Sequence, residues 1–227
     1  MHFILIFLLI FLLFFGPQFW AKRTFKKHAK PLARLQGTGG ELARHLLDRF
    51  DLKNIGVEKT KPGGDHYDPQ SQMVRLSPDN FDQKSLTAVA VAAHEVGHAI
   101  QHQHNEPKFS LRTRLVVTAH KIQRIGAAAM LIIPLVMLIT RTPYSGLLML
   151  VIGLLSLSSA AIVHLVTLPV ELDASFGKAL PILKEGYISK QDEAAVNSVL
   201  KAAAYTYVAA SLASLLNIGR WLILLRK

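Results

Sequence analysis

The feature that most constrains this chain is its separation into apolar and charged stretches. All 15 Asp and Glu residues lie in two polar segments, 22–125 and 169–202. The remaining sequence is dominated by apolar runs, which cover residues 3–20, 126–140, 147–168 and 205–225. A helix needs about 20 mostly apolar residues to cross a lipid bilayer. The pattern therefore predicts a mostly α membrane protein whose polar segments carry the chemistry.

The basic residues predict which side of the membrane the polar segments face. Of the 26 Lys and Arg residues, 22 lie in the same two polar segments, and only Arg141 lies between the two central apolar runs. Basic residues accumulate on the cytoplasmic side of membrane proteins. We therefore expect an N-terminal transmembrane anchor at 1–20, a cytoplasmic domain at 21–125, a transmembrane hairpin at 126–168, a cytoplasmic helical segment at 169–202, and a transmembrane or interfacial helix at 203–227.

The overall composition narrows the choice of partners. The formal net charge is +11, yet 51% of the residues are hydrophobic and no cysteine is present. A basic charge without a nucleic-acid-binding motif, carried by a chain this apolar, indicates attraction to anionic lipid rather than to nucleic acid. The lack of cysteine excludes disulfides and zinc–thiolate sites. The expected partners are the lipid bilayer and a peptide or protein substrate, with membrane proteins among the candidates.

The motif H-E-x-x-H stands at His94, Glu95 and His98, inside an Ala- and Val-rich stretch that favours a helix. Residues four apart lie on the same face of a helix, so both imidazoles can bind one metal ion. Glu95 can then reach a water molecule on that metal and act as general base. Imidazole nitrogens suit Zn²⁺, and a catalytic zinc site uses three protein ligands and an open position.

The third zinc ligand has several candidates. Two membrane crossings return the chain to the same face at Glu171, which is expected to begin the helix after the second central apolar run. Asp173 could serve instead, or could orient a ligand imidazole. His104 has the spacing of H-E-x-x-H-x-x-G-x-x-H enzymes, but the required Gly is Gln101 here. His102 lies about one turn, roughly 6 Å, too far along the helix axis.

The polar segment before the motif predicts a small α+β domain of the zincin kind. Thr38 can cap a helix over 41–50, in which leucines recur at helical spacing. Residues 55–59 and 72–76 read as short strands separated by Pro- and Gly-containing turns. A sheet of this kind beside the motif helix could bind an extended peptide along its edge.

The chain resembles the YugP-type neutral zinc metallopeptidases of bacterial membranes. The resemblance covers nearly the whole chain from Gly37 onward and rests on the segments 65–69, 74–77, 88–102, 167–175 and 205–210. It implies an enzyme of the bacterial inner membrane. More distantly the chain is similar to HtpX-type membrane proteases, in which a Glu on a later helix is the third ligand, and this favours Glu171. Family match and residue type also make His66 and Tyr67 candidate donors to the transition state.

These observations predict a multi-pass, membrane-anchored zinc endopeptidase whose catalytic domain faces the cytoplasm. His94, His98 and Glu171 would bind Zn²⁺, and Glu95 would activate the attacking water. Two other functions compete with this one. A site-2-type intramembrane protease needs the motif helix at bilayer depth, but only about eight apolar residues precede His94. A non-catalytic membrane scaffold with a structural zinc should have a fourth protein ligand.

Overall fold

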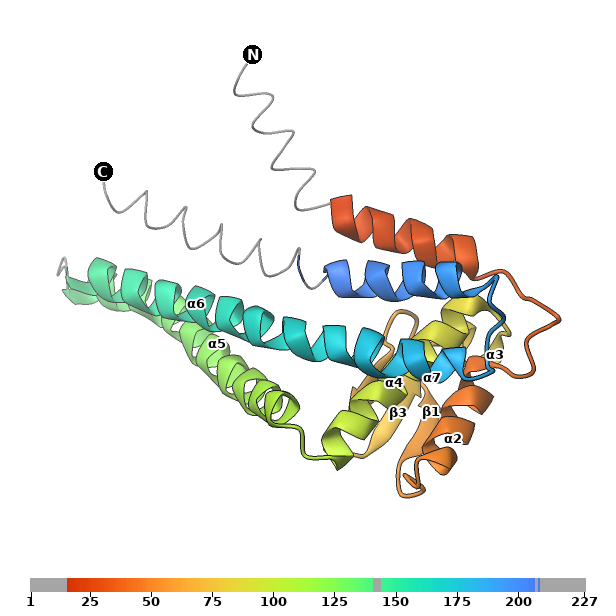
Figure 1. Cartoon of the computed structure of the whole chain (residues 1–227). Helices are drawn as coiled ribbons and strands as arrows, with labels where there is room; N and C mark the ends of the chain where they lie inside the picture. Colours follow the sequence, from red (N-terminus) through yellow and green to blue (C-terminus); the bar gives the residue numbers. More distant parts are fainter. Residues whose placement is uncertain (1–15, 141–143, 207, 209–227) are drawn as a thin grey trace, which may run out of the picture.

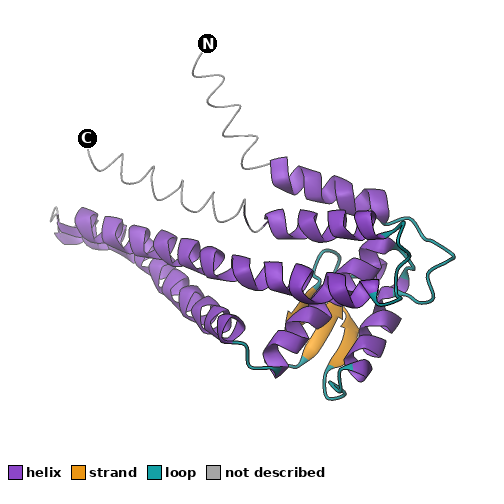
Figure 2. Cartoon of the chain, in the orientation of Figure 1, coloured by secondary structure: helices purple, strands orange, loops and turns teal. Residues whose placement is uncertain are grey.

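The structure is a computed structural model that describes residues 16–140, 144–206 and 208. Helices make up most of it, with one small sheet on the side of α2 and α4 (Figures 1 and 2). In chain order the elements are helical residues 16–28, α2 (Gly39–Arg49), β1 (Gly56–Lys59), β2 (His66–Asp68), β3 (Met73–Leu76), α3 (Pro78–Asp82), α4 (Leu86–Gln103), α5 (Pro107–Thr140), α6 (Tyr144–Leu172), the π-helix η1 (Asp173–Ala179), α7 (Leu180–Lys184) and helical residues 193–206.

The sheet is mixed, with strand order β1-β3-β2. β1 pairs in parallel with β3, so that Val57 lies beside Val74, and β2 pairs with the other edge of β3 in antiparallel fashion. β1 and β3 fall at the two predicted strands. β2 has no counterpart among the predicted elements, because three residues of mostly polar character carry no readable alternation. It forms as a strand because the free edge of β3 supplies its hydrogen-bond partners.

Helix α2 confirms the predicted helix and its cap. The Thr38 hydroxyl accepts the Glu41 amide at 3.2 Å, and the Glu41 carboxylate accepts the Thr38 amide at 2.8 Å, which is a reciprocal capping box. The helix buries Leu46 and Leu47 in the core formed with the sheet and α4. This packing sets the sheet beside the motif helix, as the hydrophobic pattern predicts.

Helices α5 and α6 run back along one another over the region of the predicted transmembrane hairpin (Figure 1). Among the described residues, one helical stretch, Pro107–Ile133, is long and apolar enough to cross a membrane by length and composition. Most of the predicted anchor 1–20 and of the predicted final helix 203–227 lies outside the described residues. The number of membrane crossings therefore stays a prediction.

The expected helix start at Glu171 is wrong. Helix α6 continues through Pro169 to Leu172 and passes without a break into η1 and α7. A proline inside a helix removes one backbone hydrogen bond and does not have to end the helix. Glu171 therefore lies in the last turn of a long helix, immediately before the backbone widens into a π-helix. Short π-helical segments of this kind are frequent at functional sites.

An ion pair joins the connection after the N-terminal helix to the C-terminal helix. The Arg34 guanidinium donates to both carboxylate oxygens of Asp192, at 3.1 and 2.5 Å. Asp192 also accepts a hydrogen bond from the Ser189 hydroxyl at 2.7 Å, and its side chain is only 6% exposed. The hydrogen bond from Arg34 is the main reason why the pKa of Asp192 lies below its ordinary value.

We expect Arg34→Gln to lower the unfolding midpoint by a few degrees at neutral pH, because Asp192 loses a charged partner. A carboxylate with a depressed pKa stabilises the folded state above its unfolded pKa, near ~4, and loses this contribution as the pH falls through its folded value. The difference between wild type and variant should therefore shrink below about pH 4. Thermal unfolding across this range measures it, with Lys30→Gln as a charge-matched control.

Candidate active site

The motif lies on α4, which is buried along nearly its whole length. Ser85 caps the helix by accepting the Ala88 amide at 3.1 Å. The small residues that follow let α2, the sheet, η1 and α7 all pack closely against this one helix (Figure 1). The motif side chains therefore project from a helix that is packed in the core of the domain, and not from a loop.

Gly97, between the two histidines, allows α4 to approach η1. A Cβ atom at this position would lie 2.9 Å from the carbonyl oxygen of Ala174, which is closer than real Cβ contacts come. Any side chain there would push the two helices apart. The glycine thus permits the close approach that brings the end of α6 to the motif.

His94, His98 and Glu171 come together at this contact. Glu171 Oε2 lies 3.2 Å from His94 Nε2 and 3.3 Å from His98 Nε2. One donor atom from each of the three residues lies within 4.8 Å of the other two, and all three residues are buried. Two imidazole nitrogens and one carboxylate oxygen are a donor set that Zn²⁺ prefers, so the residues present fit the metal that the motif predicts.

Charge complementarity supports this grouping. Burial by itself raises the pKa of Glu171, but the charge and hydrogen bonds of His98 and His94 outweigh it and hold the pKa well below the ordinary value. Arg112 approaches the other carboxylate oxygen, with Nη2 3.3 Å from Oε1. Glu171 is thus an ionised carboxylate that offers Oε2 to the histidines while Oε1 faces a guanidinium.

The far side of each imidazole is also held. His94 Nδ1 lies 3.0 Å from the Ser175 hydroxyl, and His98 Nδ1 lies 2.9 Å from the Gln101 amide oxygen. Sequence reasoning did not identify these two residues in this role. The sequence does contain a spacing that could have indicated both roles. Ser175 follows Glu171 by four residues and Gln101 follows His98 by three, so each polar residue lies on the same helical face as a candidate ligand.

Asp173 is connected to the cluster through another side chain. Its carboxylate accepts from Gln101 Nε2 at 2.8 Å and from Lys178 Nζ at 2.5 Å. The imidazole next in this chain of contacts is His98, on the other side of Gln101. Asp173 therefore contacts the candidate ligand His98 through Gln101 and not by a direct hydrogen bond.

Glu95 lies beside the cluster in a cleft of about 550 Å³. Burial is the main reason why the pKa of its carboxyl group is raised to about 7; the charge of His94 opposes this rise, and the charges of Glu171 and Asp65 add to it. The cleft is bounded by helical residues 16–28, the loops at one end of the sheet, α3, α4 and helical residues 193–206. Its lining includes Phe25, Lys26, Asp65, Ser77, Asp79, Asn80, Val91, His94, Glu95, Val199, Leu200 and Ala203.

The two candidate transition-state donors lie on β2 in different environments. The Tyr67 side chain is buried, and its hydroxyl lies 2.8 Å from His102 Nδ1. The His66 side chain is exposed, with Nδ1 2.6 Å from the Gly64 carbonyl oxygen. Neither residue is among those that line the cleft beside Glu95.

The alternative histidines lie apart from the cluster. His104 is the exposed C-terminal cap of α4. His102 bonds Tyr67 and packs against the ring of Phe109, with ring centroids 5.6 Å apart. Within the described residues, the group of donor atoms that can share one ion contains Glu171 and neither of these histidines.

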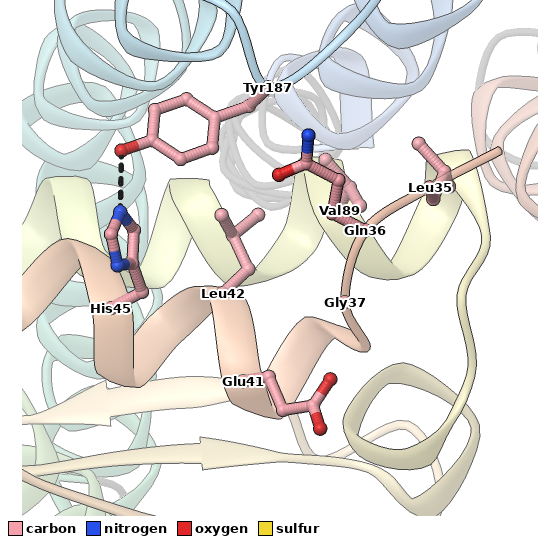
Figure 3. Close-up of a pocket in the computed structure, with 8 residues that line it drawn as sticks. All are labelled: Leu35, Gln36, Gly37, Glu41, Leu42, His45, Val89 and Tyr187. Atoms are coloured by element: carbon pink, nitrogen blue, oxygen red, sulfur yellow. Dashed lines mark hydrogen bonds between the residues drawn. The ribbon is translucent and has the colours of Figure 1, made fainter.

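A second pocket, of about 340 Å³, lies between α2 and α4 (Figure 3). One wall is closed by His45 and Tyr187, whose Nε2 and hydroxyl oxygen are 2.9 Å apart. The complete lining is Leu35, Gln36, Gly37, Glu41, Leu42, His45, Val89 and Tyr187. None of the motif residues lines this pocket, so the candidate chemistry belongs to the larger cleft beside Glu95.

Comparison with known proteins agrees with this geometry. The family model described as "Putative neutral zinc metallopeptidase" matches residues 3–226. The chain is also 38% identical over 229 residues to the "Putative membrane protease YugP" of Bacillus subtilis (strain 168), covering 99% of this chain and 96% of that protein. No solved structure matches. With the buried His–His–Glu group, these matches make the chain a zinc peptidase. The chain therefore belongs to the neutral zinc metallopeptidase family.

Proposed function

We propose that the chain is a membrane-anchored zinc endopeptidase in which His94, His98 and Glu171 bind Zn²⁺ and Glu95 is the general base. The observation that carries this proposal is the buried group of three metal-type donors, with a second acidic side chain, Glu95, beside it at the wall of a cleft. Three protein ligands leave a coordination position open, which is typical of a catalytic rather than a structural zinc.

Zinc in this site would lower the pKa of a coordinated water towards ~7 and polarise the carbonyl of the scissile peptide bond. Glu95 would accept a proton from the attacking water and then deliver it to the leaving nitrogen. Burial prepares Glu95 for this exchange, because it raises the affinity of the carboxylate for a proton.

An extended polypeptide fits the arrangement of the cleft and the sheet. β2 is an edge strand, and it packs against α4, the helix that carries Glu95. A substrate chain that adds to this side of the domain would pass the candidate catalytic carboxylate. The cleft offers an apolar wall made by Phe25, Val199 and Leu200 to substrate side chains. We infer that the substrates are peptides or unfolded protein segments, membrane proteins among them.

The proposed membrane location rests on the surface of α5 and α6. Large apolar side chains on α5 are mostly exposed: Leu131 by 77%, Leu138 by 78% and Ile139 by 81%. A continuous apolar surface of this kind is unfavourable in water and suits the interior of a bilayer. With the distribution of basic residues, this supports an inner-membrane protein with its catalytic domain on the cytoplasmic side. The Bacillus subtilis relative carries a membrane protease name.

Two observations disfavour the alternative functions. Charged side chains of Lys26, Asp65 and Asp79 line the cleft beside Glu95. Such groups are costly at bilayer depth, which argues against a site-2-type intramembrane protease. A non-catalytic scaffold should close its zinc site with a fourth protein ligand. In the part of the chain that the structure describes, the group of donor atoms has three members.

Metal removal tests the proposed function. Detergent-purified protein should cleave a casein-like substrate, lose this activity on treatment with a zinc chelator, and regain it with stoichiometric Zn²⁺ but not with Mg²⁺. Magnesium prefers oxygen ligands in octahedral geometry, so it should not replace zinc at a His–His–Glu site. Cleavage that persists after complete removal of zinc would contradict the proposal.

A further inference from the structure

Gln101 is a fully buried polar side chain next to the candidate metal centre. It lies on α4 three residues after His98 and is 0% exposed. A buried amide is unfavourable unless its hydrogen-bonding groups are satisfied. Gln101 is not a metal ligand, and the H-E-x-x-H motif does not require it. Its contacts therefore indicate a separate role.

The orientation of the Gln101 amide follows from its partners. Nε2 lies 3.0 Å from the Val170 carbonyl oxygen and 2.8 Å from a carboxylate oxygen of Asp173. The Val170 carbonyl oxygen can only accept a hydrogen bond, and the same Asp173 oxygen also accepts from Lys178 Nζ at 2.5 Å. The NH₂ group must therefore face Val170 and Asp173. The amide oxygen is left to face His98 Nδ1, at 2.9 Å.

This orientation decides the tautomer of His98. An amide oxygen only accepts, so the proton of a neutral His98 imidazole has to be on Nδ1. The lone pair is then on Nε2, the nitrogen that faces Glu171 Oε2 at 3.3 Å. A ring in the other tautomer would place its lone pair against the amide oxygen and its proton at the metal position. The Ser175 hydroxyl, which can donate or accept, makes no such choice for His94.

We propose that Gln101 is the positioning residue of the zinc site, holding His98 in the tautomer that binds metal through Nε2. This rests on the proposed function of the same site. The Val170 carbonyl, on the residue immediately before Glu171, accepts from the Gln101 NH₂ group and so fixes the amide in the orientation that presents its oxygen to His98.

Further contacts hold this network in place. Lys178 donates to Asp173 at 2.5 Å and to Glu106 at 2.7 Å. Lys178 lies on η1 and Glu106 precedes α5, so the pair joins the two segments that flank the motif helix. The acceptor that holds the Gln101 NH₂ group is itself fixed by a charged hydrogen bond, which is stronger than one between neutral groups.

The test compares the zinc dissociation constants of two variants, measured by competition with a chromogenic chelator. Gln101→Met keeps the length of the side chain but offers no acceptor to His98. Gln101→Glu keeps the acceptor but sets a carboxylate against the Val170 carbonyl and Asp173. We expect zinc binding to weaken by about 10–100-fold in the Met variant and to stay within a few fold of wild type in the Glu variant. Gln103→Met, at an exposed position of the same helix, is the matched control and should bind zinc like wild type.

Thermal unfolding of the zinc-free proteins separates positioning from packing. The Glu variant should unfold at the lower temperature, because it brings like charges together in a buried site. The two measurements should thus rank the variants in opposite orders. Equal zinc affinity in the Met variant and wild type would overturn the role of Gln101. The role would also be overturned if the Glu variant, which unfolds at the lower temperature, bound zinc more weakly than the Met variant. A wild-type protein that binds no zinc would instead contradict the proposed function.

Discussion

Glu95→Gln is expected to reduce peptide hydrolysis by at least about 10²–10⁴-fold, the usual contribution of a general base. The amide is nearly isosteric with the carboxylate but cannot accept a proton from the attacking water. Glu95 is not one of the three metal-type donors, so the variant should still bind zinc with wild-type stoichiometry. Steady-state cleavage of a fluorogenic casein-like substrate, with zinc measured on the same preparation, tests both halves of the expectation.

The control for this variant has to separate chemistry from folding. Burial of a neutral amide at position 95 is easier than burial of a carboxylate, so the variant should unfold at the same temperature as wild type or higher. Glu185→Gln, a charge-matched change at an exposed site, should leave activity unchanged. Activity close to wild type in Glu95→Gln would remove Glu95 as the base, whereas loss of both zinc and activity would assign it to the metal site instead.

Glu171→Ala is expected to abolish high-affinity zinc binding. The substitution removes the carboxylate that lies 3.2 and 3.3 Å from the two imidazole nitrogens and leaves Arg112 facing the vacated space. Loss of a ligand should cost more than the roughly 10–100-fold caused by loss of a hydrogen-bond partner of a ligand. Elemental analysis of detergent-purified protein, wild type beside variant, gives the zinc content directly.

Two further variants make this result specific. Asp173→Ala and His104→Ala address the other carboxylate and the other histidine that the sequence leaves open as third ligand. His104 is exposed at the end of α4, so its removal should not change zinc content. Asp173→Ala should weaken binding moderately, since it acts through Gln101. Full zinc in Glu171→Ala, with loss in one of these two, would assign the third ligand elsewhere.

The fold was predictable where local signals are strong. The capping box at Thr38, the Ser85 cap of the motif helix and the strands at β1 and β3 all follow from short-range pattern. Two features did not follow from it. β2 is too short to show alternation and exists only because β3 pairs with it. Helix α6 continues through Pro169, where local chemistry favours an interruption.

The amino-acid sequence by itself determined the motif, the separation of charged from apolar segments, and hence an enzyme class and a metal. The motif and the apolar segments depend on residues a few positions apart, and the relative positions of such residues along a helix are the same in any protein. Only the tertiary structure decided which carboxylate meets the histidines and what holds each imidazole. Glu171 lies beside His94, 77 residues earlier in the chain, because Gly97 allows α4 to contact η1 closely. Gln101 donates to the Val170 carbonyl across the same helix contact. Contacts between distant segments depend on packing, which short-range pattern does not encode.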